Sequence, residues 1–329
     1  MLHVLSIIAP MFVLLGVGIA AGFTPRFQRA QAGLNAFVFY FSLPAFLFVA
    51  VTSAPIHEGV PLAFVTVSLG VTTVVFALVH LAGSLVRRYL GRRAGRLDPG
   101  PLAVAATYGN VGYLGVPIVL SVLGPGAALG AALGQLLHNM LFMVGYPLWS
   151  SLRGGGAQRS GARRTESVGA LVWRIAKGSV VLNPVVLAVI AGVAVSLLRV
   201  RLPGVLMVSV EMLGQAAVPT AMFAVGLSIK PALEGMRSGS VPILAVASAG
   251  VVKLVVLPVA TLAAVALFGG GLGAQWVGAA VIMAAMPVSS TASIIVFEYD
   301  GDVRLVGATT LVTSVFAVVT IPVVLALLG

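Results

Sequence analysis

The feature that most constrains this chain is a series of apolar stretches, each long enough to cross a membrane. A helix needs about 20 apolar residues to span the hydrocarbon core of a bilayer. The 329 residues are 60% hydrophobic and only 8% charged, whereas soluble domains carry about 25% charged residues. Because no water satisfies backbone groups inside a bilayer, such stretches must be helical. The sequence therefore predicts an all-α polytopic membrane protein.

Ten spans fit the chain, and the charges between them predict its orientation. The spans are expected at residues 2–22, 33–52, 61–86, 101–123, 127–152, 180–198, 204–229, 241–268, 274–297 and 305–328. With the amino terminus outside, sixteen Lys and Arg residues lie in cytoplasmic loops and only Arg199 and Arg201 in external ones, as the positive-inside rule requires. We therefore expect a plasma (inner) membrane protein with both termini external. The net charge of +11 follows from this topology and does not indicate nucleic-acid binding.

A segment rich in Gly, Ser and Arg divides the chain into two halves of five spans. Residues 153–167 predict a flexible cytoplasmic linker, and residues 168–178 predict either a short interfacial helix or the start of span six. The domains are then 1–152, the linker region 153–179, and 180–329. Since five is odd, the halves have opposite topology, as in many secondary transporters. The stretch Leu43–Phe48 resembles Val218–Phe223 at an offset of 175 residues, and the same offset carries Pro117 onto Ala292.

Two spans contain residues that a membrane helix normally avoids. Span four includes Tyr108–Pro117, which holds three glycines, Asn110 and a proline. A helix interior loses about 1 kcal/mol for each glycine and about 3 kcal/mol for a proline. Span nine includes Pro287 followed by a run of hydroxyl residues. Broken backbone at membrane depth is tolerated only where it is buried in protein or lines a cavity. We therefore expect broken, crossing helices four and nine.

These residues resemble the auxin efflux carrier family, which includes PIN-type auxin carriers of plants and bacterial carriers of malonate or other small organic acids. The motifs that carry the resemblance cover almost the whole chain. They are Asn110–Pro117, Asn183-Pro184, Pro219–Leu227, Lys253–Pro258 and Met286–Tyr299. The resemblance implies a 5+5 inverted repeat, scaffold spans one, two, six and seven, an elevator-like motion, and often a homodimer through the scaffold. Plant relatives place a second proline in span nine, where this chain has Ala292.

The two breaks predict an anion site. A broken helix leaves free N–H groups at the start of its second half, and that end carries about half a positive charge. The site therefore suits a carboxylate. We expect it to be formed by Asn110, Val111, Gly112, Tyr113, Gly115, Pro117, Pro287, Ser289, Ser290, Thr291, Ser293, Ser42, Pro44, His138 and Asn139. The alternative is that the small and hydroxyl residues only tighten helix packing, and that His138 is a hydrogen-bonded packing group.

Three further polar residues are candidates for coupling or charge pairing. Lys253 lies deep in span eight, where an ionisable residue is rare and usually functional. It is a candidate for pairing with the substrate, for pairing with a carboxylate, or for anchoring contacts between domains. Glu211 and Gln215 lie in span seven, where Glu211 either acts in transport or reaches the outer interface.

The function predicted from these features is secondary transport of a small organic anion by alternating access. The alternatives are a sodium- or proton-coupled symporter of the bile-acid type, and a membrane sensor or scaffold that does not transport. We expect no enzyme activity, no cofactor and no metal site, because no catalytic or phosphate-loop pattern is present and the chain has no cysteine. The expected partners are the substrate anion, the lipid bilayer and a second copy of the chain, with no nucleic acid.

Overall fold

The computed structural model describes residues 2–53, 59–91, 97–152, 173, 182–237, 242–299 and 301–328. Within these residues every regular element is helical, apart from one isolated antiparallel bridge. The helical content agrees with the predicted all-α class of polytopic membrane protein. The predicted linker and interfacial helix at 153–179 lie outside the described residues, except for Trp173.

The helical elements follow one another with short connections. In chain order they are α1 (Leu2–Gly22), α2 (Pro25–Phe37), η1 (Val38–Ser42), α3 (Leu43–Thr52), α4 (Leu62–Leu90), α5 (Pro99–Thr107), η4 (Val111–Gly115), α6 (Val116–Leu123), η5 (Pro125–Ala127), α7 (Ala128–Met140), η6 (Leu141–Gly145), α8 (Tyr146–Leu152), α10 (Pro184–Leu198), α11 (Gly204–Gln215), α12 (Ala217–Leu227), α13 (Ile229–Arg237), α14 (Ile243–Val251), η8 (Val252–Val256), α15 (Leu257–Phe268), α16 (Ala274–Ala284), α17 (Ser290–Glu298) and α18 (Val303–Leu328).

Six helical segments of the described chain are long and apolar enough to cross a membrane. They are Pro25–Thr52, Leu62–Leu90, Pro125–Ser150, Gly204–Pro231, Ile243–Phe268 and Val303–Leu328, and shorter apolar helices occupy Ala9–Gly22, Val111–Leu123, Pro184–Leu198 and Ala274–Ala284. The helical segment expected at 33–52 begins earlier, at Pro25. A proline is tolerated in the first helical turn because the N–H that it lacks would have no partner there. The ten-span count itself stays a prediction.

Four π-helical segments of the described chain, η1, η4, η6 and η8, share one local cause. Each is followed by one residue and then a proline: Pro44, Pro117, Pro147 and Pro258. A proline lacks the N–H that would bond to the carbonyl four residues earlier, and its ring crowds that carbonyl. Widening the turn relieves the crowding, and in η1, η4 and η8 the residue before the proline donates to the carbonyl five residues earlier. The prolines therefore fix where these spans bend.

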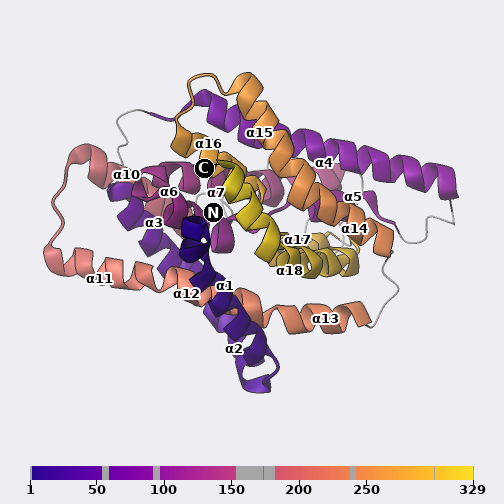
Figure 1. Cartoon of the computed structure of the whole chain (residues 1–329), viewed down its shortest axis with the longest axis horizontal. Coiled ribbons are helices and arrows are strands. Elements are labelled where there is room, and N and C mark those ends of the chain that lie inside the picture. The colour runs from indigo at the N-terminus through magenta and orange to yellow at the C-terminus, as the bar shows by residue number, and fades with distance from the viewer. Residues whose placement is uncertain are drawn as a thin grey trace.

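Close helix pairs form one end of the molecule. Figure 1 shows α3, α10 and α11 together at one end, with α4, α5 and α14 toward the other. Glycines allow the close approach: Gly214 of α11 faces the backbone of Phe46, and Gly192 of α10 faces Val51. In the middle, α1 crosses α12, where Gly226 lies against the α1 backbone. A side chain at Gly226 would overlap that backbone.

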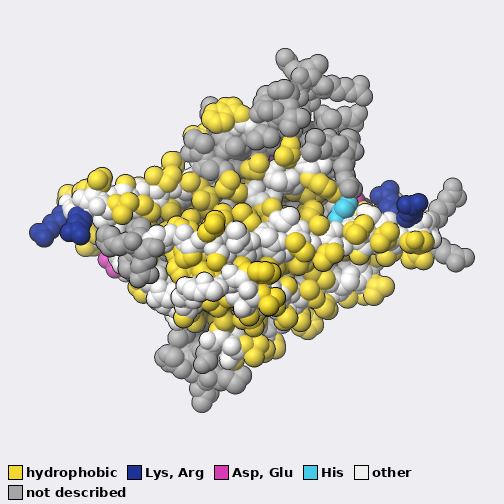
Figure 2. All heavy atoms as spheres, turned by 90° about the horizontal axis from the view of Figure 1, so that it is seen from above, with side chains coloured by type: hydrophobic (Ala, Val, Ile, Leu, Met, Phe, Trp, Pro, Cys, Tyr) yellow, Lys and Arg dark blue, Asp and Glu magenta, His cyan; other side chains and the backbone are white. Residues whose placement is uncertain are grey.

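The buried core has two parts, and the surface is broadly apolar. One cluster joins residues of α3, α6, α7 and α16, and the other joins residues of α5, α14, α17 and α18. Figure 2 shows an apolar face with Lys and Arg side chains at its two ends. An apolar band of this kind is what a lipid-embedded protein presents to the bilayer.

Candidate functional site

The first interruption lies between α5 and η4. Helix α5 ends at Thr107, and the backbone is extended at Tyr108. Asn110 then caps the next helical segment: its Oδ1 accepts from the N–H of Tyr113 at 3.3 Å, and its carbonyl accepts from Leu114 and Gly115. Asn110 is 5% exposed. Because the side chain of Asn110 is already engaged as a cap, its role is to fix the start of η4.

The second interruption lies between α16 and α17, and it pairs with the first. Ser289 caps α17 by accepting from the N–H of Thr291 at 3.2 Å. The two interruptions form an antiparallel bridge between Gly109 and Val288. In this bridge Asn110 N donates to the Pro287 carbonyl at 2.7 Å, and Ser289 N donates to the Tyr108 carbonyl at 3.0 Å. Each interruption therefore supplies hydrogen-bond partners that the other has lost.

The remaining N–H group at the centre of each interruption is satisfied by a side chain. Gly109 N donates to His138 Nε2 at 2.9 Å, and Val288 N donates to Thr313 Oγ1 at 3.1 Å. His138 belongs to α7 and Thr313 to α18, and they are 175 residues apart. A ring nitrogen that accepts a hydrogen bond carries no proton, so His138 is neutral in this arrangement. Both side chains act as acceptors that hold the two paired interruptions in place.

Lys253 lies next to the paired interruptions and is fully buried, with 0% exposure. Its Nζ donates to the carbonyl of Ala284, the last residue of α16, at 2.6 Å. Gly109 packs against the same ammonium, because a Cβ at Gly109 would lie 3.1 Å from both Nζ and Cε. Lys253 makes no ion pair within the described residues. The lysine therefore touches both interruptions through the backbone.

The glycines after Asn110 are closely packed by neighbouring side chains. A Cβ at Gly112 would lie 3.0 Å from Gln135 Nε2, and one at Gly115 would lie 2.6 Å from Met283 Sδ. Gly115 therefore serves the packing of α16 against η4, which matches the packing alternative for this residue. Gly112 instead faces the side-chain amide of Gln135, so the absence of a Cβ at Gly112 leaves room next to that amide.

Two buried polar atoms, one in α7 and one in η1, have no hydrogen-bond partner in the part of the chain that the structure describes. They are Gln135 Oε1, whose amide group faces Gly112, and Ser42 Oγ. A buried polar atom without a partner costs about 1–3 kcal/mol, so such atoms call for a water, ion or ligand. Gln135 also lines a cavity of about 480 Å³ between α7 and α10, together with Asn139.

The other predicted site residues differ in how far they are buried. Val111, Pro117, Pro44 and Pro287 are buried; Tyr113 is partly buried, and its hydroxyl donates to the Asn35 carbonyl. In the first turn of α17, Ser290 is exposed, and Thr291 and Ser293 are half-buried. Asn139 accepts from the Tyr108 hydroxyl at 3.4 Å.

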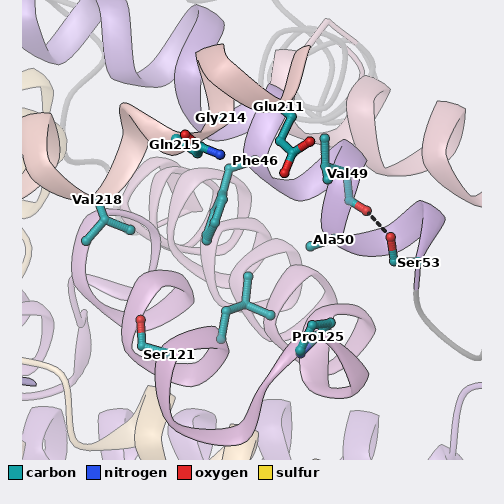
Figure 3. A pocket seen from close by; sticks show the side chains of 11 residues that line it. Phe46, Val49, Ala50, Ser53, Ser121, Pro125, Glu211, Gly214, Gln215 and Val218 are labelled. Carbon is teal, nitrogen blue, oxygen red and sulfur yellow. Dashed lines mark hydrogen bonds between the residues drawn. The ribbon is translucent and has the colours of Figure 1, made fainter. Parts of the chain in front are cut away.

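Glu211 and Gln215 lie in a separate cavity of about 440 Å³ between α3, α6 and α11. Figure 3 shows them on one wall of this cavity, with Ser121 and Pro125 on the opposite wall. Both side chains are exposed. The structure therefore brings Asn110, Lys253 and His138 together at the paired interruptions, but it places Glu211 and Gln215 apart from them.

Comparison with known proteins decides the family. Residues 3–325 match the family described as "Membrane transport protein". The chain is also 31% identical over 322 residues to the "Putative malonate transporter" of Rhizobium meliloti (strain 1021), which covers 98% of this chain and 94% of that protein. The chain belongs to this family. Membership confirms the auxin efflux carrier resemblance drawn from the motifs, and it indicates a membrane-embedded transporter rather than an enzyme.

Two residues of this family member were missed by reasoning from sequence. Gln135 lies in an apolar stretch of α7 and carries no motif, so its contact with Gly112 could not be foreseen. Thr313 did have a signal, because it lies 175 residues after His138, the same offset that relates Leu43-Pro44 to Val218-Pro219. A polar residue repeated at that offset, in spans of equal rank, could have been paired with His138.

Proposed function

We propose that this protein is a secondary carrier that moves a small organic anion with a carboxylate group, at the crossing of α5–α6 with α16–α17. The observation that carries the proposal is the antiparallel backbone pairing of Tyr108–Asn110 with Pro287–Ser289. Two helical segments, η4 and α17, begin at this pairing and leave it in opposite directions. Family membership supports transport as the activity.

The electrostatics of the crossing favour an anion. The first N–H groups of a helical segment have no partner within it, which leaves those of Val111, Gly112 and Ser290 available for a ligand. Each segment start carries roughly half a positive charge. Two such starts together suit one carboxylate, and the hydroxyls of Ser290 and Thr291 add hydrogen-bond donors.

The substrate contacts that we propose continue into α7. The partnerless atom Gln135 Oε1 lies near Gly112, and Gln135 also lines the cavity of about 480 Å³, whose other lining residues are mainly aliphatic, with Asn139 and Asn183 as further polar groups. An anion bound at the η4 start could place its organic part there. The relative named for malonate supports a carboxylate, and malonate belongs in the first panel of substrates.

The contacts between helices support a 5+5 inverted repeat with ten spans. Under that plan α1 and α12 belong to spans one and seven, and α3 and α10 to spans two and six; both pairs are in contact. The pairs α7–α16 and α5–α18 join spans five with nine and four with ten. These pairings are reciprocal between the halves, as a two-fold relation requires. We assign α1, α3, α10 and α12 to the scaffold. The crossing then belongs to the part that moves in an elevator mechanism.

The energetics allow export without a coupled ion. An inside-negative potential of 100 mV drives one negative charge outward with about 2.3 kcal/mol. Uptake of the same anion would require a second driving gradient. Export is therefore the direction that the proposed site can support by itself.

The test is flux in proteoliposomes with a panel of labelled monocarboxylates and dicarboxylates, malonate included. Pro117→Ala is the informative variant, because it restores an N–H and removes the cause of the π turn in η4. Pro322→Ala is the matched control, since Pro322 also lies inside a helix but far along α18. We expect carboxylate flux in the parent and the control and a strong loss in Pro117→Ala. Parent-like flux in Pro117→Ala would contradict the site.

A further inference from the structure

Lys253 stands where the carboxyl-terminal ends of two helices meet. Helix α16 ends at Ala284, whose carbonyl accepts from Lys253 Nζ at 2.6 Å. Helix α5 ends at Thr107, and η8, which carries Lys253, packs against α5. Each helix carboxyl terminus carries roughly half a negative charge. The single positive charge of the Lys253 ammonium therefore balances the two partial negative charges of these helix ends.

The surroundings of Lys253 are those of a cation site built from neutral oxygen. No acidic side chain pairs with it in the described ranges, and helix α18, with buried Thr309 and Thr313, packs against η8. Sodium sites in carriers with interrupted helices use backbone carbonyls and the carboxyl-terminal ends of half-helices. Hard cations bind such oxygen atoms. The ammonium of Lys253 thus lies at the kind of position where a co-transported cation would bind.

We propose that Lys253 is a built-in substitute for a coupling cation: its ammonium permanently occupies the cation position, so that anion binding at the crossing needs no sodium. This inference rests on the proposed carrier function. It explains why a lysine is buried without a carboxylate partner. The ammonium offsets the two negative helix ends and leaves the two positive segment starts free to attract the substrate.

Two substitutions separate this role from a purely structural one. Lys253→Ala removes the charge and leaves room for an ion beside the Ala284 carbonyl. Lys253→Met removes the charge but fills the same space with an apolar stem. Lys230→Ala is the control, because Lys230 is a surface lysine at the start of α13, paired with Glu234 at 3.7 Å.

The primary readout is thermal unfolding in sodium chloride against N-methyl-D-glucamine chloride at equal ionic strength. We expect a saturable rise in the Tm of Lys253→Ala with sodium, and no sodium-specific rise for the parent, Lys253→Met or Lys230→Ala. This readout requires no substrate, so it stands even if the parent transports none of the carboxylates tested. Absence of carboxylate flux in the parent would sink the proposed function and not this assignment of the cation position.

The second readout is carboxylate flux, and its parent measurement tests the proposal even if the Lys253 variants do not fold. Parent flux should be the same with and without a sodium gradient. In Lys253→Ala, sodium should restore flux at least tenfold over its value in N-methyl-D-glucamine, and Lys253→Met should show no restoration. A sodium-driven parent, or a folded Lys253→Ala that ignores sodium in both readouts, would overturn the proposal.

Discussion

Exchanging Asn110 for aspartate tests the anion site most sharply, because it changes charge while keeping the cap. Asn110 Oδ1 accepts from the Tyr113 N–H at 3.3 Å, and an aspartate oxygen at the same place can accept the same bond, since Asn and Asp are about equally good caps. Asn110→Ala removes the acceptor without adding charge. The two variants therefore separate loss of the cap from repulsion of the substrate.

The two variants are expected to differ in stability and in substrate affinity. Loss of the cap in Asn110→Ala leaves the part-buried N–H of Tyr113 without its acceptor and destabilises the segment by about 1 kcal/mol. In Asn110→Asp, a carboxylate about 5 Å from a bound anion repels it by roughly 3 kcal/mol at an effective dielectric constant of about 20. That corresponds to roughly a hundredfold loss of affinity. Asn110→Asp should therefore be the poorer carrier of the two variants.

The assay pairs thermal unfolding in detergent with carboxylate flux in proteoliposomes at neutral pH. Asp98→Asn is the control, because Asp98 caps the other end of α5 and its exchange also changes one charge. Helix α5 separates it from the crossing by about 14 Å along the axis. We expect flux close to that of the parent in Asp98→Asn. If Asn110→Asp folds and transports like the parent, the crossing does not bind the anion.

Substitutions at three further positions, one of them with a matched control, test other parts of the structure. Thr313→Val keeps the side-chain shape but leaves the Val288 N–H without its acceptor, and it should lower stability by about 1–3 kcal/mol, measured as a lower Tm. Gly226→Ala should lower the Tm because its Cβ would overlap the α1 backbone, whereas Gly16→Ala, which has open space around it, should leave the Tm equal or higher. Gln135→Leu removes a buried amide oxygen that has no partner in the described structure; we expect stability to hold while binding of the substrate, followed by isothermal titration, weakens about tenfold, which is about 1.4 kcal/mol.

Much of the crossing was accessible from sequence because its residues have strong local effects. Proline and glycine disfavour a helix interior, so their concentration in one short stretch, as at Gly109 and Pro117, and at Pro287, marked the two interruptions. Asn110 and Ser289 are cap-forming residue types, and each does cap the segment that follows it. The burial of Lys253 followed from its position inside a long apolar stretch.

Other parts of the site depend on tertiary contacts that no local pattern encodes. Gly115 was expected to face a ligand, but Met283, far away in the chain, packs against it. The role of His138 as a backbone acceptor required knowing which N–H group faces it. Glu211 was a candidate for coupling because it is charged within a span, and only the packing of α11 on α3 places it in a cavity of its own.

The measurement that tests the central claim most directly is a cryo-EM structure of the protein with the carboxylate that the flux panel selects. The account predicts density for the anion within hydrogen-bond distance of the N–H groups of Val111 and Gly112 or of Ser290, beside Gln135. Density in the Glu211 cavity instead, with the crossing unchanged and unoccupied by the anion, would contradict it.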